Sequence, residues 1–224
     1  TAAFIADFYR TLDIEVETNI GGNGVIARVY GAKPGKTVAL RADFDALPIQ
    51  DLKDVPYKST VPGVMHACGH DGHTATLLLL AKIINELREN LEGTYVFIHQ
   101  HAEEYSPGGA KPMIEAGCLN GVDVIFGTHL WVTVPTGTLQ YALGPIMAAA
   151  DRFTITIQGK GGHGAKPHET KDAVVAGAQL VTTLQQIVSR RVNPIDPAVV
   201  TIGSFVADNT FNVIADTATL IGTV

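Results

Sequence analysis

The stretch His66-Ala-Cys-Gly-His-Asp-Gly-His-Thr74 runs directly into residues 75–90, an apolar segment with the pattern of a helix. Three imidazoles, a thiol and a carboxylate lie within its first eight residues, and these are the donors of a site for a borderline or soft metal ion. The alternative is that Asp71 caps the helix, Cys68 is a small buried residue and the histidines are solvated. Capping a helix does not require Cys-Gly-His before the cap and a further histidine after it. The stretch therefore predicts a metal site.

Three apolar runs around this stretch are predicted as buried strands of an α/β sheet: residues 37–42, 94–98 and 123–127. Each run ends in side chains that can bind a metal: Asp43 and Asp45 after the first, His99 to Glu104 after the second, and His129 after the third. The carboxyl ends of parallel strands meet at one edge of an open α/β sheet. We therefore expect these side chains to converge on the loop that carries Cys68.

Each of these strand ends also has a plainer interpretation. Glu103 and Glu104 are neighbours on a non-helical segment and point in different directions, so one can bind a metal while the other acts as a base. The same pair is also compatible with a solvated acidic corner before Gly108-Gly109. A plain turn remains an alternative for Asp43, and a single histidine at a strand end, such as His129, is ordinarily only hydrogen-bonded.

The rest of the pattern predicts two domains, residues 1–149 and 150–224. The first begins with an amphipathic helix over residues 1–12 and a hairpin over residues 14–30. The second has an alternating strand from residue 152, a long helix over residues 171–192 and two further strands, which is the order of a small α+β sandwich. The chain starts without Met inside a helical pattern and ends on an apolar segment, so we expect it to be truncated at both ends.

Composition narrows the possible partners. The chain has 224 residues, 46% of them hydrophobic and 17% charged, with a formal net charge of −6. These are globular values, and the acidic balance disfavours a nucleic acid or an anionic membrane surface as partner. The apolar runs are too short to span a bilayer. With only two cysteines, Cys68 and Cys118, a reduced, cytoplasmic setting fits better than a disulfide framework.

The motifs taken together resemble the amidohydrolase, or aminoacylase, group of the dinuclear metallopeptidases. That group contains hydrolases of N-acyl amino acids, hippurate, auxin conjugates and N-acetyldiaminopimelate. The resemblance covers essentially the whole chain and rests on six motifs in this order: Arg41-Ala-Asp-Phe-Asp-Ala-Leu-Pro48, His66-Ala-Cys-Gly-His-Asp-Gly-His73, Gln100-His-Ala-Glu-Glu104, Gly127-Thr-His129, Gly159-Lys-Gly-Gly-His163 and Phe211-Asn-Val-Ile214. The Cys-Gly-His-Asp block with the later Glu-Glu pair is specific, whereas Gly-Gly-His alone would be a weak signal.

The resemblance implies an α/β catalytic domain with an inserted α+β, ferredoxin-like lid that forms a homodimer. It implies two divalent metal ions, zinc or manganese with cobalt or nickel as further candidates, and the following roles: Cys68, His70, Glu104 and His129 as metal ligands, Glu103 as general base, and His163 and Asn212 as substrate-binding residues. The chain departs from the group at His101 and Ala215, where proline is usual. It also stops before the segment that carries one more histidine ligand in the group.

The expected reaction is hydrolysis of the amide bond of an N-acyl amino acid, such as an N-acetyl or benzoyl derivative, by a metal-activated water. Two alternatives stay open: a dipeptidase or carboxypeptidase of the same clan, and an inactive binding or dimerisation fragment. The sequence does not choose the acyl group, the amino acid, the metal or the role of His101.

Overall fold

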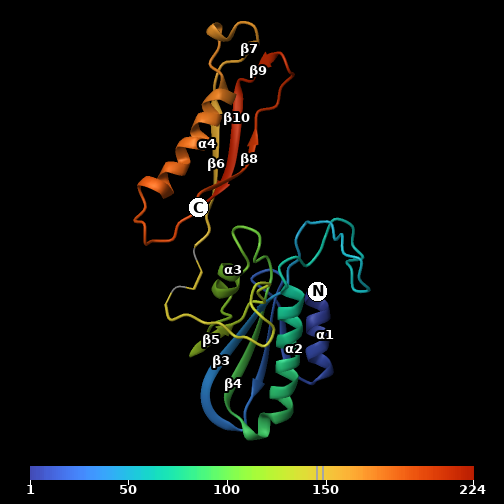
Figure 1. Cartoon of the computed structure of the whole chain (residues 1–224). Helices are drawn as coiled ribbons and strands as arrows, with labels where there is room; N and C mark the ends of the chain where they lie inside the picture. Colours follow the sequence, from blue (N-terminus) through green and yellow to red (C-terminus); the bar gives the residue numbers. More distant parts are fainter. Residues whose placement is uncertain (145, 148) are drawn as a thin grey trace. The chain divides into compact units, whose positions relative to one another are not determined.

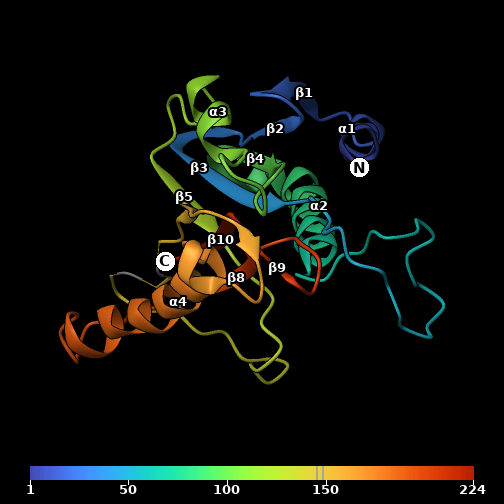
Figure 2. The ribbon, with the colours of Figure 1, turned by 90° about the horizontal axis from the view of Figure 1, so that it is seen from above.

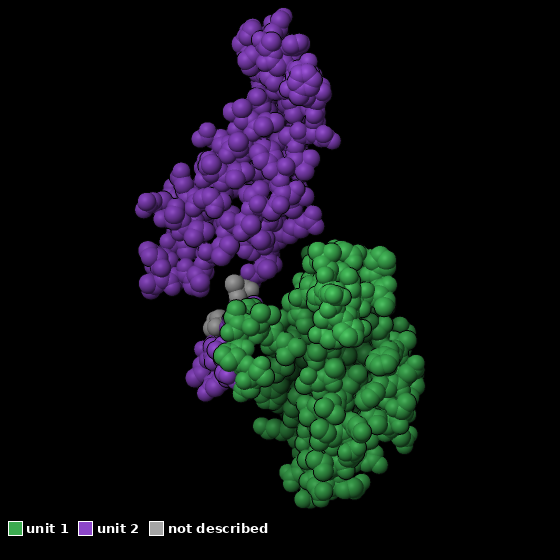
Figure 3. Space-filling model, turned by 45° about the vertical axis from the view of Figure 1, so that its right-hand side comes forward, with its two compact units in different colours: residues 1–137 green, residues 138–224 purple. Residues whose placement is uncertain are grey.

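The computed structural model describes residues 1–144, 146–147 and 149–224. Its contacts divide the chain into two compact units, residues 1–137 and 138–224, which Figure 3 shows in different colours. Each unit has its own sheet and helices. The predicted division after residue 149 remains a prediction. Two residues of the predicted first domain, Pro145 and Ala148, lie outside the described residues.

Unit 1 is built on a mixed five-stranded sheet with the order β1-β2-β4-β3-β5 (Figure 1). Its strands are β1 (Glu15–Ile20), β2 (Gly24–Tyr30), β3 (Lys33–Asp43), β4 (Glu92–Gln100) and β5 (Val124–Gly127). The β1–β2 and β2–β4 pairs are antiparallel, whereas β3 runs parallel to both β4 and β5. The predicted α/β class is confirmed, and three parallel strands deliver their carboxyl ends to one edge.

Helices cover both faces of this sheet. On one face lie α1 (Ala2–Thr11) and α2 (His70–Leu87), and their apolar residues form a core with alternate residues of the strands. The short α3 (Ala110–Glu115) packs on the other face, where Met113 meets the intervening strand residues. Figure 2 shows α2 and α3 on opposite sides of the sheet. Alternate residues of each strand therefore face two different hydrophobic cores. Both sets of residues in β4 are buried, which is why its sequence is continuously apolar.

The helix after the metal stretch begins at His70, earlier than the predicted residue 75. Gly69 precedes it with φ of 83°, a left-handed conformation that glycine adopts at little cost. The early start places His70 on the first turn of α2. His70 and His73 are therefore spaced on a helix, whereas His66 and Cys68 lie in the loop before it.

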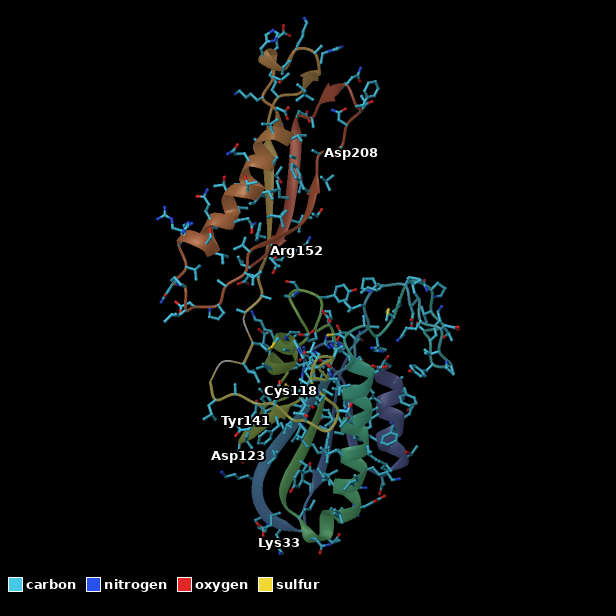
Figure 4. The ribbon with its side chains drawn as sticks, in the orientation of Figure 1. Lys33, Cys118, Asp123, Tyr141, Arg152 and Asp208 are labelled. Carbon is cyan, nitrogen blue, oxygen red and sulfur yellow. The ribbon has the colours of Figure 1, made fainter. Side chains whose placement is uncertain are left out.

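Strand β5 differs from the prediction, because it is exposed rather than buried. Among the described residues it stands at the end of the sheet and pairs with β3 alone, so Ile125 and Phe126 are 47% and 57% exposed. Its start is held by Asp123, labelled in Figure 4, whose carboxylate accepts a hydrogen bond from the Thr37 amide at 2.7 Å. An apolar run predicts a strand, but it does not predict whether the strand is central in the sheet and buried or lies at its edge and is exposed.

Unit 2 contains a three-stranded antiparallel sheet with the order β6-β10-β8: β6 (Arg152–Gln158), β10 (Thr217–Thr223) and β8 (Thr201–Val206). Helix α4 (Ala173–Arg190) begins at Asp172, whose carboxylate accepts hydrogen bonds from the amides of Val174 and Val175. The helix lies close to the sheet at Gly177, where a Cβ atom would stand 2.6 Å from the Phe205 ring. This arrangement agrees with the predicted order of elements.

A smaller two-stranded ribbon of unit 2 pairs β7 (Gly162–His163) with β9 (Val213–Ile214). Two short 3-10 helices complete the elements: η1 (Arg88–Asn90) in unit 1 and η2 (Pro167–Glu169) in unit 2. Within the described residues, no helix combines the length and apolar character needed to cross a membrane.

Candidate metal centre

The predicted site residues of unit 1 lie at the edge where its parallel strands end. They follow the strands in this way: Asp45 after β3, Glu103 and Glu104 after β4, and His129 after β5. Cys68 and His70 reach the same edge from the start of α2. The convergence expected from the sequence is therefore present, and it follows from the parallel pairing of these strands.

Two groups of side chains place their metal-binding atoms within 4.8 Å of one another, and His70 belongs to both: Cys68, His70 and His129 form one group, and His70, Glu103 and Glu104 form the other. The Sγ atom of Cys68 lies 3.5 Å from Nε2 of His129. Nε2 of His70 lies 3.9 Å from Oε1 of Glu104. The structure thus brings together the four predicted ligands and the predicted base.

His70 is the centre of this arrangement, and its hydrogen bonds fix its proton. Its Nδ1 atom lies 3.1 Å from the backbone oxygen of Asp45 and 3.2 Å from Oδ1 of the same residue. Both neighbours are acceptors, so Nδ1 carries the proton and Nε2 presents a lone pair. That Nε2 atom is buried and has no hydrogen-bond partner in the part of the chain that the structure describes. A buried lone pair beside a thiol, an imidazole and carboxylates fits a metal ligand.

Asp45, which the sequence placed at the site without a role, is hydrogen-bonded to two of the predicted ligand residues. Its Oδ1 atom accepts from His70, and its Oδ2 atom accepts the backbone N–H of Glu104 at 3.1 Å. One carboxylate therefore orients an imidazole from α2 and the loop after β4. The position of this acidic residue at the end of a buried strand was the signal available in the sequence.

His129 is oriented by its own loop. Its Nδ1 atom donates to the backbone oxygen of Leu130 at 2.6 Å, which leaves the Nε2 lone pair facing the Cys68 sulfur. The ring packs edge-on against Trp131, with 5.4 Å between the ring centroids. His129 therefore has the tautomer that a ligand through Nε2 requires.

The surroundings of Cys68 and Asp43 shift the pKa values of these two side chains in opposite directions. Burial, a hydrogen bond to Glu104 and the charge of Glu104 together raise the pKa of the Cys68 thiol to about 11. Burial also raises the pKa of Asp43, but the hydrogen bond from His73 and the charge of Arg41 outweigh it, so the pKa lies below its ordinary value. The thiol sits among carboxylates and lacks a cation of its own. A bound metal ion would supply that cation and favour the thiolate.

The two predicted substrate-binding residues lie in unit 2, on and beside the β7–β9 ribbon. The backbone oxygen of Asn212 accepts the Gly164 amide at 2.8 Å, so the main chain brings Asn212 and His163 together. Nδ1 of His163 accepts the Ala165 amide at 3.1 Å, which places the ring proton on Nε2. His163 is exposed and presents this N–H as a donor.

His101, whose role the sequence left open, fills a niche beside the β1–β2 turn. A Cβ atom on Gly22 would stand 2.9 Å from its Nε2 atom, and Gly22 has φ of 119°. The Nδ1 atom of His101 is buried and has no hydrogen-bond partner among residues 1–144, 146–147 and 149–224. His101 therefore packs against this turn, and it belongs to neither of the two ligand groups above.

Comparisons with known proteins agree with this geometry. The sequence profile of Peptidase family M20/M25/M40 matches residues 39–223. YhaA of Bacillus subtilis is 68% identical over 223 residues, which cover 100% of this chain and 56% of the relative. The N-acyl-L-amino acid amidohydrolase of Geobacillus stearothermophilus is 54% identical over 200 residues, which cover 89% of this chain and 54% of the relative. Thermostable carboxypeptidase 2 of Saccharolobus solfataricus is 45% identical over 226 residues, which cover 100% of this chain and 58% of the relative.

A solved structure is similar over nearly the whole chain. The crystal structure of Bacillus subtilis YXEP, described as a dinuclear metal binding peptidase from the M20 family, matches with a TM-score of 0.75 and 40% identity over 99% of this chain and 56% of that one. The chain spans about half the length of the curated relatives it matches. The resemblance drawn from the six motifs is confirmed. The chain belongs to Peptidase family M20/M25/M40.

Proposed function

We propose that this chain carries the dinuclear metal site of an amidohydrolase that cleaves the amide bond of N-acyl amino acids. The observation that carries the proposal is the buried, unpartnered Nε2 atom of His70, set among the thiol, imidazole and carboxylate donors of unit 1. The similarity to the Geobacillus N-acyl-L-amino acid amidohydrolase supports the substrate class.

The ligands in this proposal are Cys68, His70, Glu104 and His129. Two divalent cations bound there would lower the pKa of a shared water and polarise the amide carbonyl. A thiolate among nitrogen and oxygen donors favours zinc, while the mixed set also accommodates manganese, cobalt or nickel. Cys68 must remain a thiol to serve as a ligand, and both cysteines are free, so we place the enzyme in a reducing, cytoplasmic setting.

Glu103 is the general base in this mechanism. It follows β4 beside Glu104 and is exposed, so its carboxylate can take a proton from water and later return it to the leaving amine. Adjacent carboxylates on a non-helical segment allow Glu104 to act as a ligand while Glu103 stays free.

The unit 2 residues complete the mechanism. The Nε2–H of His163 is an available donor and suits the oxyanion that develops on the carbonyl oxygen. The side chain of Asn212 would donate to the free carboxylate of the amino acid. We also propose a homodimer through unit 2, where β8 stands at the end of its sheet and can pair with a second copy.

The proposal is tested with Glu103→Ala in the full-length gene product, assayed on N-acetyl and benzoyl amino acids. Loss of the base should lower kcat about 10²- to 10⁴-fold while metal content by elemental analysis stays at the wild-type value. Glu115→Ala, which removes an exposed carboxylate from α3, is the matched control and should leave both quantities unchanged. Full activity of Glu103→Ala would remove the base assignment.

A carboxypeptidase or dipeptidase is the second candidate, because a carboxypeptidase of Saccharolobus solfataricus is 45% identical. Comparing kcat/KM for N-acyl amino acids with kcat/KM for dipeptides separates the two. Measuring metal per chain and hydrolysis on the 224 residues beside the full-length gene product tests the third possibility, an inactive binding fragment. Higher kcat/KM for dipeptides would overturn the N-acyl proposal.

A further inference from the structure

A third group of potential metal-binding atoms lies behind the proposed ligands and consists of Asp43, His70 and His73. His73 is buried, and both of its ring nitrogens are already engaged. Nε2 accepts the backbone N–H of Leu130 at 2.8 Å, so the ring proton is on Nδ1, which donates to Oδ1 of Asp43 at 2.6 Å. His73 therefore has no free lone pair for a metal ion.

The partners of His73 belong to two parts of the site that are far apart in the sequence. Leu130 directly follows His129, so the bond to Nε2 holds the backbone of the loop that carries this ligand. Asp43 ends β3 and also accepts Arg41 Nη1 at 2.7 Å. The Arg41 guanidinium in turn donates to Oε1 of Gln100, the last residue of β4, at 2.8 and 2.9 Å.

These bonds form one chain that runs from the end of β4 through Arg41, Asp43 and His73 to the loop after β5. Within the described residues, β5 is exposed and pairs with β3 alone, so the bond to His73 adds to the packing of the Leu130 side chain near Gly72 in holding this loop. Within the described residues, the contacts of the His129 ring itself are with its neighbour Leu130, with the edges of aromatic rings and with the Cys68 sulfur.

We propose that His73 is a positioning residue: it sets the position of His129 relative to Cys68 by accepting the Leu130 amide, and Asp43 fixes the tautomer that allows this. The inference rests on the proposed function, because it treats His129 and Cys68 as ligands. It assigns the third histidine of the stretch to support of the metal centre and not to the metal itself.

Two substitutions separate the two hydrogen bonds of His73. Glutamine can place an amide oxygen near the position of Nε2, so His73→Gln retains an acceptor for Leu130. Asparagine can place its amide nitrogen near Nδ1, so His73→Asn retains the donor to Asp43 but loses the acceptor. His168→Asn, at an exposed histidine of unit 2, is the matched control.

The measurement is a Co²⁺ titration of the metal-free full-length gene product, followed by visible absorption including the thiolate-to-cobalt band of Cys68. His73→Asn should bind Co²⁺ about 10- to 100-fold more weakly than wild type, as loss of an outer-sphere partner does, and its spectrum should change. His73→Gln should stay within about threefold of wild type and keep the wild-type spectrum. Thermal unfolding of the metal-free variants reports any general loss of packing.

Equal affinities and spectra for His73→Asn and wild type would overturn the positioning role. Equal weakening in both His73 variants would also overturn it, because the acceptor to Leu130 would then not be the cause. If the wild-type protein and the His168→Asn control fail to bind Co²⁺, the proposed metal site itself fails. That result is distinct from a failure confined to the His73 variants.

Discussion

The carboxyl edge of the unit 1 sheet and the β7–β9 ribbon of unit 2 hold their predicted site residues in opposite ways. At the edge, Cys68 is half-buried and Glu103, Glu104 and His129 are exposed, but they surround a buried pair of side chains. Asp43 and His70 are 0% and 1% exposed, and both are fixed by side-chain hydrogen bonds. In the ribbon, His163 and Asn212 are exposed, and backbone hydrogen bonds hold the chain. Substituting a buried side chain at the edge therefore changes the positions of its neighbours in the site. Substituting a side chain on the ribbon leaves the backbone pairing of β7 with β9 in place.

The comparison predicts that substitutions on the ribbon change the reaction and leave metal binding alone. His163→Ala removes the proposed oxyanion donor and should lower kcat/KM about 10²- to 10³-fold. Metal content should not change, since the main-chain pairing of β7 with β9 does not use the ring. Steady-state kinetics with elemental analysis on the full-length gene product check both statements.

His163→Gln is the control for this prediction, because its amide keeps an N–H donor. It should recover part of the lost kcat/KM. A loss of metal in His163→Ala would break the distinction between ribbon and edge, and equal kcat/KM in His163→Ala and wild type would remove the oxyanion role.

Substitutions at the edge should have the reverse effect and act first on the metal. Asp45→Asn replaces an acceptor of two hydrogen bonds by a group with one donor, which faces either the His70 ring or the Glu104 amide. Metal affinity should fall about 10- to 100-fold, measured by competition with a chelating dye. Asp54→Asn, an exposed aspartate of the loop before Cys68, should bind as wild type does.

A smaller effect is expected at the second ribbon residue. Asn212→Ala removes one proposed hydrogen bond to the substrate carboxylate at an exposed position, worth about 1.5 kcal/mol at the lower end for a charged partner, so KM should rise about tenfold. The backbone bond from Gly164 to Asn212 is independent of the side chain, so the unfolding temperature should be unchanged. A KM equal to wild type, for N-acyl amino acids with a free carboxylate, would contradict the assignment.

The smallest effect concerns His99, the penultimate residue of β4, which differs from the expectation because it belongs to none of the potential metal-binding groups found among the described residues. His99 lies in the core of unit 1, where its Nε2 atom is hydrogen-bonded to the Tyr9 hydroxyl at 2.8 Å, and burial lowers its pKa to about 3. The unfolded chain takes up a proton near pH 6.5 while the folded chain does not, so stability falls as pH falls below 6.5. Between pH 6.5 and 5.5 the loss should be about 1 kcal/mol.

Denaturant unfolding of wild type and His99→Gln across this pH range gives the free energy of unfolding of each protein at each pH. The difference between their two pH dependences is the contribution of His99. The glutamine amide can still bond to Tyr9 but does not titrate. A pH dependence of wild type that matches His99→Gln would show that His99 does not contribute. Unlike His70, which is also buried, His99 has no carboxylate among its hydrogen-bond partners in the described part of the chain.

Much of unit 1 followed from the sequence alone. Apolar runs ending in acids and histidines predicted parallel strands with ligands at one edge, because parallel pairing requires the strand ends to coincide. The Cys-Gly-His stretch predicted the metal chemistry, since few packing needs place a thiol and three imidazoles within eight residues. The roles of Glu103, His163 and Asn212 remain predictions, because they depend on a bound substrate.

What the tertiary structure alone decided is how each polar atom is used. Donor chemistry alone does not separate His70 from His73, and only the resemblance named His70 as a ligand. In the structure, Asp45 leaves the Nε2 lone pair of His70 free while Leu130 occupies that of His73. It also gave β5 the same apolar pattern as β4, although β5 stands at the end of the sheet. The residue types determine which groups can form hydrogen bonds and in what order helices and strands follow one another. Which lone pair remains free, and which strand side stays uncovered, depends on partners brought together from distant parts of the chain.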